Sequence, residues 1–148
     1  MSDAEIYANP DPVTAIAMLV EAGLPTGDLG ATDWSHFLAS GPRKAPEGLV
    51  GLELLGKVAL LRSLIVGEQA RGRGLGAALV RAAEAHAANE GVQTLFLLTE
   101  TAERFFAVRG YQPVARETVP ADIVGTREFS ELCPENAVVM CKQLGAAA

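Results

Sequence analysis

The chain has 148 residues, a length typical of one domain, so we expect a single domain spanning residues 1–148. Its 49 % hydrophobic and 20 % charged residues fit an ordinary globular protein, and the net charge of −6 argues against general nucleic-acid binding. No apolar stretch approaches the roughly 20 residues of a membrane span, and no secretory segment opens the chain. We therefore expect a cytoplasmic protein without nucleic-acid or membrane partners.

The first predicted element is a helix. Asp11 suits the N-cap position and Pro12 the first turn, and the pattern continues to about residue 22, where Gly23 ends it. A loop and a short strand over residues 34–39 should follow. We expect the buried face of the helix to hold Ile16, Leu19 and Val20.

A β-hairpin comes next. Residues 49–55 and Val58–Val66 favour two strands joined by a turn at Gly56 and Lys57. This register places Glu53 and Arg62 diagonally on one face of the sheet. Because charged groups among apolar strand residues need a partner or water, the two side chains either form a cross-strand ion pair or line a binding site.

The second half of the chain predicts an amphipathic helix followed by alternating strands and helices. Apolar residues recur at helical spacing from Leu75 onward, with His86 on the same face, and Gly91 suits the C-cap. Together with the hairpin, this pattern indicates an α+β fold with a mixed sheet flanked by helices. The further expected strands cover residues 94–99, 111–116 and 137–143, and the further helices residues 102–108 and 120–132.

The loop between the second hairpin strand and the amphipathic helix has the composition of an anion site. Its three glycines let the backbone approach a ligand, and they lie where the first free N–H groups of the helix point outward. Phosphate is the commonest ligand of such a site, and an ordinary Gly-rich turn is the alternative. The loop residues are Arg71, Gly72, Arg73, Gly74, Leu75 and Gly76.

Two known phosphate-binding patterns can be compared with this loop. It is not a P-loop, because no Gly-Lys-Ser/Thr follows its first glycine at the required spacing. Gly72, Gly74 and Ala77 satisfy the looser dinucleotide pattern, and Glu100 lies at roughly the ribose-binding distance. That pattern normally opens a long βαβαβ array, whereas about half of this chain precedes it. A nucleotide-dependent oxidoreductase therefore stays only as a remote alternative.

The order of strand, glycine loop and helix resembles the GNAT superfamily of N-acetyltransferases. Arg71, Gly74 and Gly76 match its Arg/Gln-x-x-Gly-x-Gly/Ala signature, and residues 102–111 are similar to its later Ala-x-x-Phe-Tyr-x-x-x-Gly-Phe segment. The two matches together span about residues 48–115. The resemblance implies an α/β/α sandwich with a mostly antiparallel sheet, whose central strands splay apart to admit acetyl-CoA.

By this resemblance, the protein transfers an acetyl group from acetyl-CoA directly to the primary amine of a small molecule, without a metal. The backbone of Leu64 and Val66 would hold the acetyl and pantetheine arm, and the glycine loop would hold the pyrophosphate. The N–H of Val66 is the candidate oxyanion donor. Glu53 is the candidate base, acting through water, and Arg62 the candidate ligand of an anionic group on the acceptor. A homodimer is left open.

Two residues depart from the family pattern. Phe106 stands where many members have a tyrosine, and Thr99 stands where they have an asparagine. Because phenylalanine cannot donate a proton, Phe106 is expected only to line the cofactor site. Thr99 is the candidate acid, with Thr101, Tyr111 and water as alternatives, or the thiolate leaves unassisted. A catalytically silent domain that binds CoA is the other function left open.

A closer resemblance concerns the acceptor. Residues 22–29, 60–63 and 126–134 are similar to acetyltransferases of bacterial arsenic-resistance operons, whose wider group acetylates arsenic- or phosphorus-containing glutamate analogues. This implies that the acceptor is an anionic amino-acid analogue. Cys133 and Cys141 are too few for a disulfide framework or a three-thiolate arsenite site, have no metal-site spacing and are poor nucleophile candidates. His86 is expected to be packed or solvated.

Overall fold

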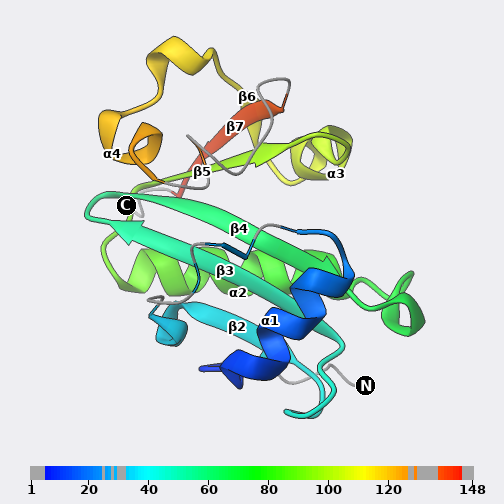
Figure 1. Ribbon diagram of the computed structural model, residues 1–148. Helices are drawn as coiled ribbons and strands as arrows, with labels where there is room; N and C mark the ends of the chain where they lie inside the picture. Colours follow the sequence, from blue (N-terminus) through cyan, green and yellow to red (C-terminus); the bar gives the residue numbers. More distant parts are fainter. Residues whose placement is uncertain are drawn as a thin grey trace.

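The computed structural model describes residues 6–24, 26–27, 29, 33–126, 129 and 137–144 (Figure 1). Over these residues the strands are β1 (Ile6–Ala8), β2 (Phe37–Ser40), β3 (Gly48–Leu55), β4 (Val58–Val66), β5 (Thr94–Thr99), β6 (Gln112–Pro113) and β7 (Val138–Gln143). The α-helices are α1 (Pro12–Glu21), α2 (Leu75–Asn89), α3 (Glu103–Val108) and α4 (Ala121–Val124). The 3-10 helices are η2 (Trp34–His36), η3 (Glu68–Ala70) and η4 (Arg116–Thr118).

The strands form one sheet in the order β1-β2-β3-β4-β5-β7-β6. The pair β4–β5 is parallel, as expected for strands joined through the crossover helix α2, and the other pairs are antiparallel. The expected α+β fold, with a mixed and mostly antiparallel sheet flanked by helices, is therefore confirmed (Figure 1).

The hairpin of β3 and β4 has the predicted register. Leu55 faces Val58 across the two-residue turn and Glu53 faces Leu60, while Gly56 in the turn has a φ of 81°. Alternation along the strands then places Glu53 and Arg62 on one face, as the sequence predicts.

The first helix begins as predicted but its buried face is partly different. The Asp11 side chain caps α1 by accepting hydrogen bonds from the hydroxyl and the backbone N–H of Thr14, which lower the pKa of Asp11. Leu19 is fully buried, but Val20 is 59 % exposed, so its expected burial is wrong. The helix packs on the sheet through Ala15 and Leu19, and Val20 lies on the outer side of that contact.

The two faces of the sheet are covered differently. On one face α2 packs against a single large apolar cluster, which includes Leu52, Leu61 and Leu79. The opposite face carries two smaller clusters: one under α1 around Phe37, and one around Leu60 that includes the α4 residue Ile123. Figure 1 shows α1 in front of β3 and β4, with α2 behind them.

Several short elements differ from the sequence-based expectation. Residues 34–36 form η2, so the strand expected over 34–39 is β2 and begins at Phe37. The strand expected over 111–116 is only the two-residue β6, followed by η4. The helix expected over 120–132 is α4, which ends at Val124, and residues 127–128 and 130–132 lie outside the described residues. The edge strand β1 was not predicted, because three residues carry too little periodicity.

Candidate active site

The glycine loop leads from β4 through η3 into α2. Gly74 is the N-cap of α2 in a left-handed conformation, with a φ of 79°, and none of the described side chains caps the helix. The first N–H groups of α2 are therefore left to bind an anion. A Cβ atom placed on Gly72 or Gly74 would meet no described atom within 4 Å, so the space beside the loop is open.

The two arginines of the loop hold it together. The Nε of Arg71 donates to the carbonyl oxygen of Val66 at 3.1 Å, and Nη2 of Arg73 donates to that of Gln69 at 3.3 Å. Nη2 of Arg73 also lies 3.9 Å from a carboxylate oxygen of Glu47. Because a guanidinium carries five N–H groups, each arginine keeps further donors for a ligand.

Beside this loop the central strands separate. The pairs between β4 and β5 end at Leu60 and Phe96, although β4 continues to Val66. The far edge of β5 stays paired with β7 as far as Thr99, so the opening lies on the β4 side alone. Figure 1 shows the two strands diverging toward the end that carries the glycine loop. The expected splayed central strands are confirmed.

Polar backbone groups of β4 face this gap. The N–H of Gly67 donates to the carbonyl oxygen of Glu47, on the β3 side, at 2.8 Å. Because successive residues of a strand direct their N–H and C=O groups to opposite edges, those of Val66 and Leu64 point toward β5. The bond from Arg71 to the carbonyl oxygen of Val66 agrees with this direction.

A β-bulge lies in β4 where it leaves β5. Ser63 and Leu64 both oppose Val50, and the register shifts at this point. Ser63 has a φ of 61°, a left-handed conformation that is uncommon for any residue other than glycine. Such strain costs about 1–3 kcal/mol and concentrates at functional sites. The bulge redirects β4 at the start of the gap.

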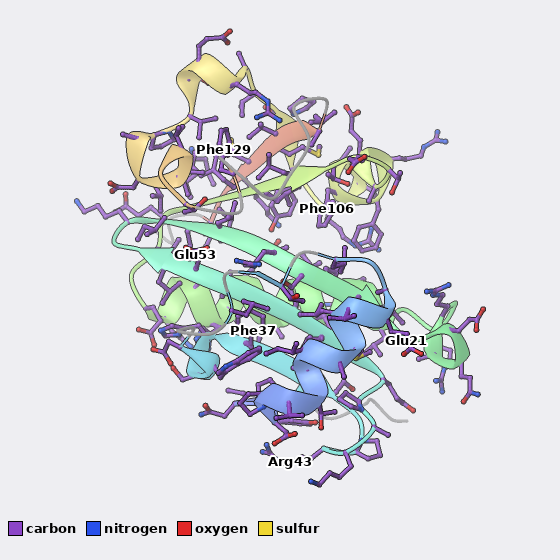
Figure 2. The ribbon with its side chains drawn as sticks, viewed as in Figure 1. Glu21, Phe37, Arg43, Glu53, Phe106 and Phe129 are labelled. Atoms are coloured by element: carbon purple, nitrogen blue, oxygen red, sulfur yellow. The ribbon has the colours of Figure 1, made fainter. Side chains whose placement is uncertain are left out.

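Glu53 and Arg62 form the cross-strand ion pair that was one of the two predicted alternatives. Nη1 of Arg62 lies 3.6 Å from Oε1 of Glu53, and Nε of Arg62 donates to Oγ of Ser63 at 3.2 Å. The Arg62 side chain is 3 % exposed, whereas that of Glu53 is 36 % exposed although its Oε1 is buried. Figure 2 shows Glu53 between α1 and Phe129. The ion pair thus lies between the apolar cluster under α1 and the cluster beside α4, and the Glu53 side chain is partly open to solvent.

A cavity of about 580 Å³ borders the end of β4 on the α1 side. Its walls come from the second half of α1, from residues 44–46 and from the start of the glycine loop. They bring two acidic side chains, Glu21 and Glu68, near two basic ones, Lys44 and Arg71. A polar small molecule can therefore approach the end of β4 from this side.

Helix α3 places two phenylalanines differently. Phe106 is 5 % exposed and its ring packs edge-on against Tyr111 in the large core cluster (Figure 2). Phe105 instead reaches the glycine loop: its Cζ lies 3.4 Å from the position of a Cβ on Gly76, and Cγ2 of Val66 lies 3.6 Å from the same point. Phe105, the neighbour of the predicted Phe106, is thus the residue that lies beside the loop.

The candidate acids occupy distinct positions. Thr99 ends β5, and its Oγ1 accepts a hydrogen bond from the N–H of Ala102 at 2.9 Å, which leaves its hydroxyl proton to be donated. Tyr111 is 2 % exposed and donates to a carboxylate oxygen of Glu84 at 2.9 Å. Burial and the nearby Glu84 both raise the pKa of Tyr111. Because the hydroxyl proton of Tyr111 is already donated to Glu84, Tyr111 is a poor candidate for the acid.

Other polar residues lie away from this site. Burial raises the pKa of the Cys141 thiol, as expected for an unreactive cysteine, and Cys133 lies outside the described residues. Nδ1 of His36 lies 3.0 Å from Nε2 of His86, and Asp33 lies 3.4 Å from His36. No spacing in the chain indicates this pairing, because the two histidines are 50 residues apart.

The described part of the chain holds neither a metal cluster nor a membrane-spanning helix. In the described part of the chain, no three or more His, Cys, Asp or Glu side chains gather as a metal site would require. None of the described helices is long and apolar enough to span a membrane.

The sequence is similar to known acetyltransferases. The profile of the acetyltransferase (GNAT) family matches residues 36–112. An uncharacterized N-acetyltransferase of Chlorobaculum tepidum, CT2212, is 42 % identical over 67 residues, which cover 45 % of this chain and 43 % of that protein. The chain therefore spans less than half the length of this curated relative.

Solved structures agree in fold. N-acetylglutamate synthase from Neisseria gonorrhoeae, in complex with coenzyme A and N-acetyl-glutamate, superposes with a TM-score of 0.79 at 19 % identity, over 99 % of this chain and 36 % of that one. Rv2747 from Mycobacterium tuberculosis, solved with CoA, gives 0.75 at 19 % identity, over 94 % and 98 % of the two chains. A putative N-acetyltransferase from Lactobacillus plantarum gives 0.69 at 23 % identity, over 97 % and 98 %. Since the family profile covers more than half of the sequence and the fold agrees with it, the chain belongs to the acetyltransferase (GNAT) family.

Proposed function

We propose that this protein is an acetyl-CoA-dependent N-acetyltransferase acting on the primary amine of a small molecule. The observation that carries the proposal is the open glycine loop at the uncapped start of α2, directly beside the gap between β4 and β5. The pyrophosphate of acetyl-CoA fits the loop at residues 71–76, and its pantetheine arm fits the gap beside Leu64 and Val66. Two solved neighbours that contain coenzyme A support the same co-substrate.

The chemistry needs no covalent enzyme intermediate. The nitrogen of a neutral amine attacks the thioester carbonyl carbon, a C–N bond forms, the nitrogen loses one proton to water, and the C–S bond then breaks to release the CoA thiolate. The N–H of Val66, directed into the gap, donates to the oxyanion. Glu53, partly open to solvent, takes the ammonium proton through water, and the Thr99 hydroxyl donates a hydrogen bond to the departing thiolate.

We infer further that the acceptor is an amino-acid analogue with an extra anionic group. Arg62 is held in place by Glu53 and Ser63, and a guanidinium fixed in this way binds a planar oxyanion through two parallel hydrogen bonds. The neighbour solved with N-acetyl-glutamate supports an acetylated amino acid with a second carboxylate. The resemblance to acetyltransferases of arsenic-resistance operons points to the same chemistry, and that link and the cytoplasmic location stay predictions.

Two measurements test the function. Calorimetric titrations with acetyl-CoA, CoA and NAD identify the co-substrate, and a thiol-release assay over a panel of amines identifies the acceptor, with glutamate and its phosphorus-containing analogues included. Binding of acetyl-CoA together with amine-dependent thiol release supports the proposal. Binding of NAD without acetyl-CoA would contradict it.

A catalytically silent domain that binds CoA is the second candidate. It is favoured by the lack of a tyrosine acid, because Phe106 has no hydroxyl and the hydroxyl of Tyr111 is bonded to Glu84. Binding of acetyl-CoA without thiol release for any amine in the panel would select this candidate.

A further inference from the structure

Arg109, the residue that follows α3, is held in an unusual position. Its Cζ lies 3.9 Å from the centroid of the Phe105 ring, and its Nη1 donates to the carbonyl oxygen of Phe105 at 2.8 Å. Its Nε is buried and has no hydrogen-bond partner within the described part of the chain. That Nε is out of a ligand's reach, but the residue as a whole is half-buried and its guanidinium carries five N–H groups, so donors on the Nη atoms remain for an anion supplied from outside the chain.

The Phe105 ring connects this guanidinium to the glycine loop. The edge of the ring faces Gly76, while Arg109 lies against the ring face. Gly76 is the second residue of α2, so its N–H is among the free groups at the start of that helix. Figure 1 shows α3 at the same end of the sheet as the loop. The Phe105 ring therefore lies between the guanidinium of Arg109 and the start of α2, where the anion site is proposed.

The loop's own arginines leave room for a further cation. Arg71 and Arg73 each use one donor on a carbonyl oxygen of the chain, and Arg73 also lies near Glu47. An acyl donor with a pyrophosphate and a 3′-phosphate carries several negative charges, whereas the chain as a whole has a net charge of −6. Cations concentrated at one site are needed to offset this repulsion.

We propose that Arg109 binds a phosphate of the acyl donor and so supplies the cofactor site with a cation from α3. This inference rests on the proposed function, since it takes acetyl-CoA as the ligand of the glycine loop. It makes Arg109 a determinant of donor recognition that lies outside the loop motif. The competing role is structural, because an arginine at a helix C-terminus also binds the last carbonyl groups of the helix.

Two substitutions separate these roles. Arg109→Gln removes the charge, and Arg109→Lys keeps the charge but loses the planar stack on Phe105. Arg104→Gln is the matched control, because Arg104 is exposed on α3, close to Arg109 in the chain, and its substitution removes the same charge from the protein. Affinities for CoA and 3′-dephospho-CoA are measured by calorimetry at low and high salt, with a thermal unfolding scan for each variant.

We expect Arg109→Gln to weaken CoA binding about tenfold or more at low salt and less at high salt, with Arg109→Lys recovering part of the loss. Arg104→Gln should change the affinity less than about twofold. A loss with CoA that disappears with 3′-dephospho-CoA assigns the 3′-phosphate, and an equal loss with both assigns the pyrophosphate.

Unchanged CoA affinity in Arg109→Gln would overturn the inference. So would a loss that is independent of salt and is not recovered by lysine, because it would indicate a structural role. If the unaltered protein does not bind CoA, the proposed function itself fails, and this result is distinct from either outcome for Arg109.

Discussion

The two faces of the sheet differ in how they are closed. Under α2, one continuous apolar cluster runs from β3 to α3, and the ion pair of Glu84 and Lys142 lies at its edge, against Tyr111. On the opposite face the apolar residues form two clusters, one under α1 and one beside α4. Arg62 and Glu53 lie between these clusters, where a continuous core would place apolar side chains.

This difference separates the two substrates of the proposed reaction. The proposed donor site is built by a short stretch of chain, from the end of β4 into α2. The acceptor side brings together β3, β4, α1 and segments on the α4 side, which are distant in sequence. In this proposal, the packed face supports the helix that binds the cofactor, and the ion pair of Glu53 and Arg62 on the other face contributes to acceptor specificity.

The largest expected effect is on kcat, when the proposed base Glu53 on the α1 face of the sheet is replaced. Glu53→Gln should lower kcat about 100-fold, because a positioned general base contributes roughly that much or more. The loss should be most severe at low pH, where little of the acceptor amine is neutral. Steady-state kinetics between pH 6 and 9 check this, with acetyl-CoA affinity as the control.

Glutamine can still accept a hydrogen bond from Arg62, so the unfolding temperature of Glu53→Gln should change little. An unfolding temperature that falls while kcat is retained would mean that the pair is only structural.

A second change tests how tightly the α1 cluster is packed. A Cβ on Gly51 would lie 2.4 Å from two ring atoms of Phe37, so Gly51→Ala forces the ring to move. We expect the free energy of unfolding to fall by about 1–3 kcal/mol, as for other overpacked cores. Urea denaturation measures it. In the Phe37→Leu background the same substitution should cost clearly less, and an equal cost there would show that the ring is not the obstacle.

The next prediction concerns Arg62. Arg62→Lys keeps the charge but loses the planar fork, so KM for an anionic acceptor should rise about tenfold or more while KM for acetyl-CoA stays nearly constant. Kinetics with both substrates varied provide the measurement. A rise of the same size for an uncharged amine would remove Arg62 from acceptor recognition.

The smallest expected effects are the stability changes caused by alanine at two glycines of the proposed cofactor loop. Gly74 has a positive φ, so Gly74→Ala should lower stability by about 1 kcal/mol and weaken acetyl-CoA binding. Gly76 lies inside α2, and an added Cβ would make ordinary contacts with Phe105 and Val66. Gly76→Ala should therefore raise stability by about 0.5–1 kcal/mol with binding retained. Thermal unfolding measures the stability of both variants, and calorimetry measures their affinity for acetyl-CoA. A stabilising Gly74→Ala together with a destabilising Gly76→Ala would contradict the left-handed cap at Gly74.

The fold could be predicted where the chain has long regular patterns. The hairpin strands, β5 and α2 follow from apolar runs, a two-residue turn and helical spacing, and their observed bounds agree closely with the prediction. The short elements β1 and β6 depend on pairing with distant strands, and three or two residues show no periodicity of their own. The exposure of Val20 likewise depends on how α1 is rotated against the sheet, which helical spacing alone does not decide.

The site could be predicted in the same uneven way. The glycine loop is a local feature, and its left-handed cap follows from the residue type. The neighbouring contacts depend on tertiary packing: the sequence pointed to Phe106, but the turn of α3 carries Phe105 to the loop and Arg109 onto its ring. The pairing of Tyr111 with Glu84 also joins distant segments, and no spacing in the chain indicated it.

The gap between β4 and β5 has a consequence for handling the protein. Without a ligand, the N–H groups of Leu64 and Val66 form a strand border that can accept the backbone of another molecule, and such borders promote aggregation. The pantetheine arm is extended and carries two amide groups, so it can occupy this border as a short substitute strand. Bound coenzyme A should then cover this edge and keep concentrated preparations monodisperse. Its removal by dialysis should make the protein prone to self-association.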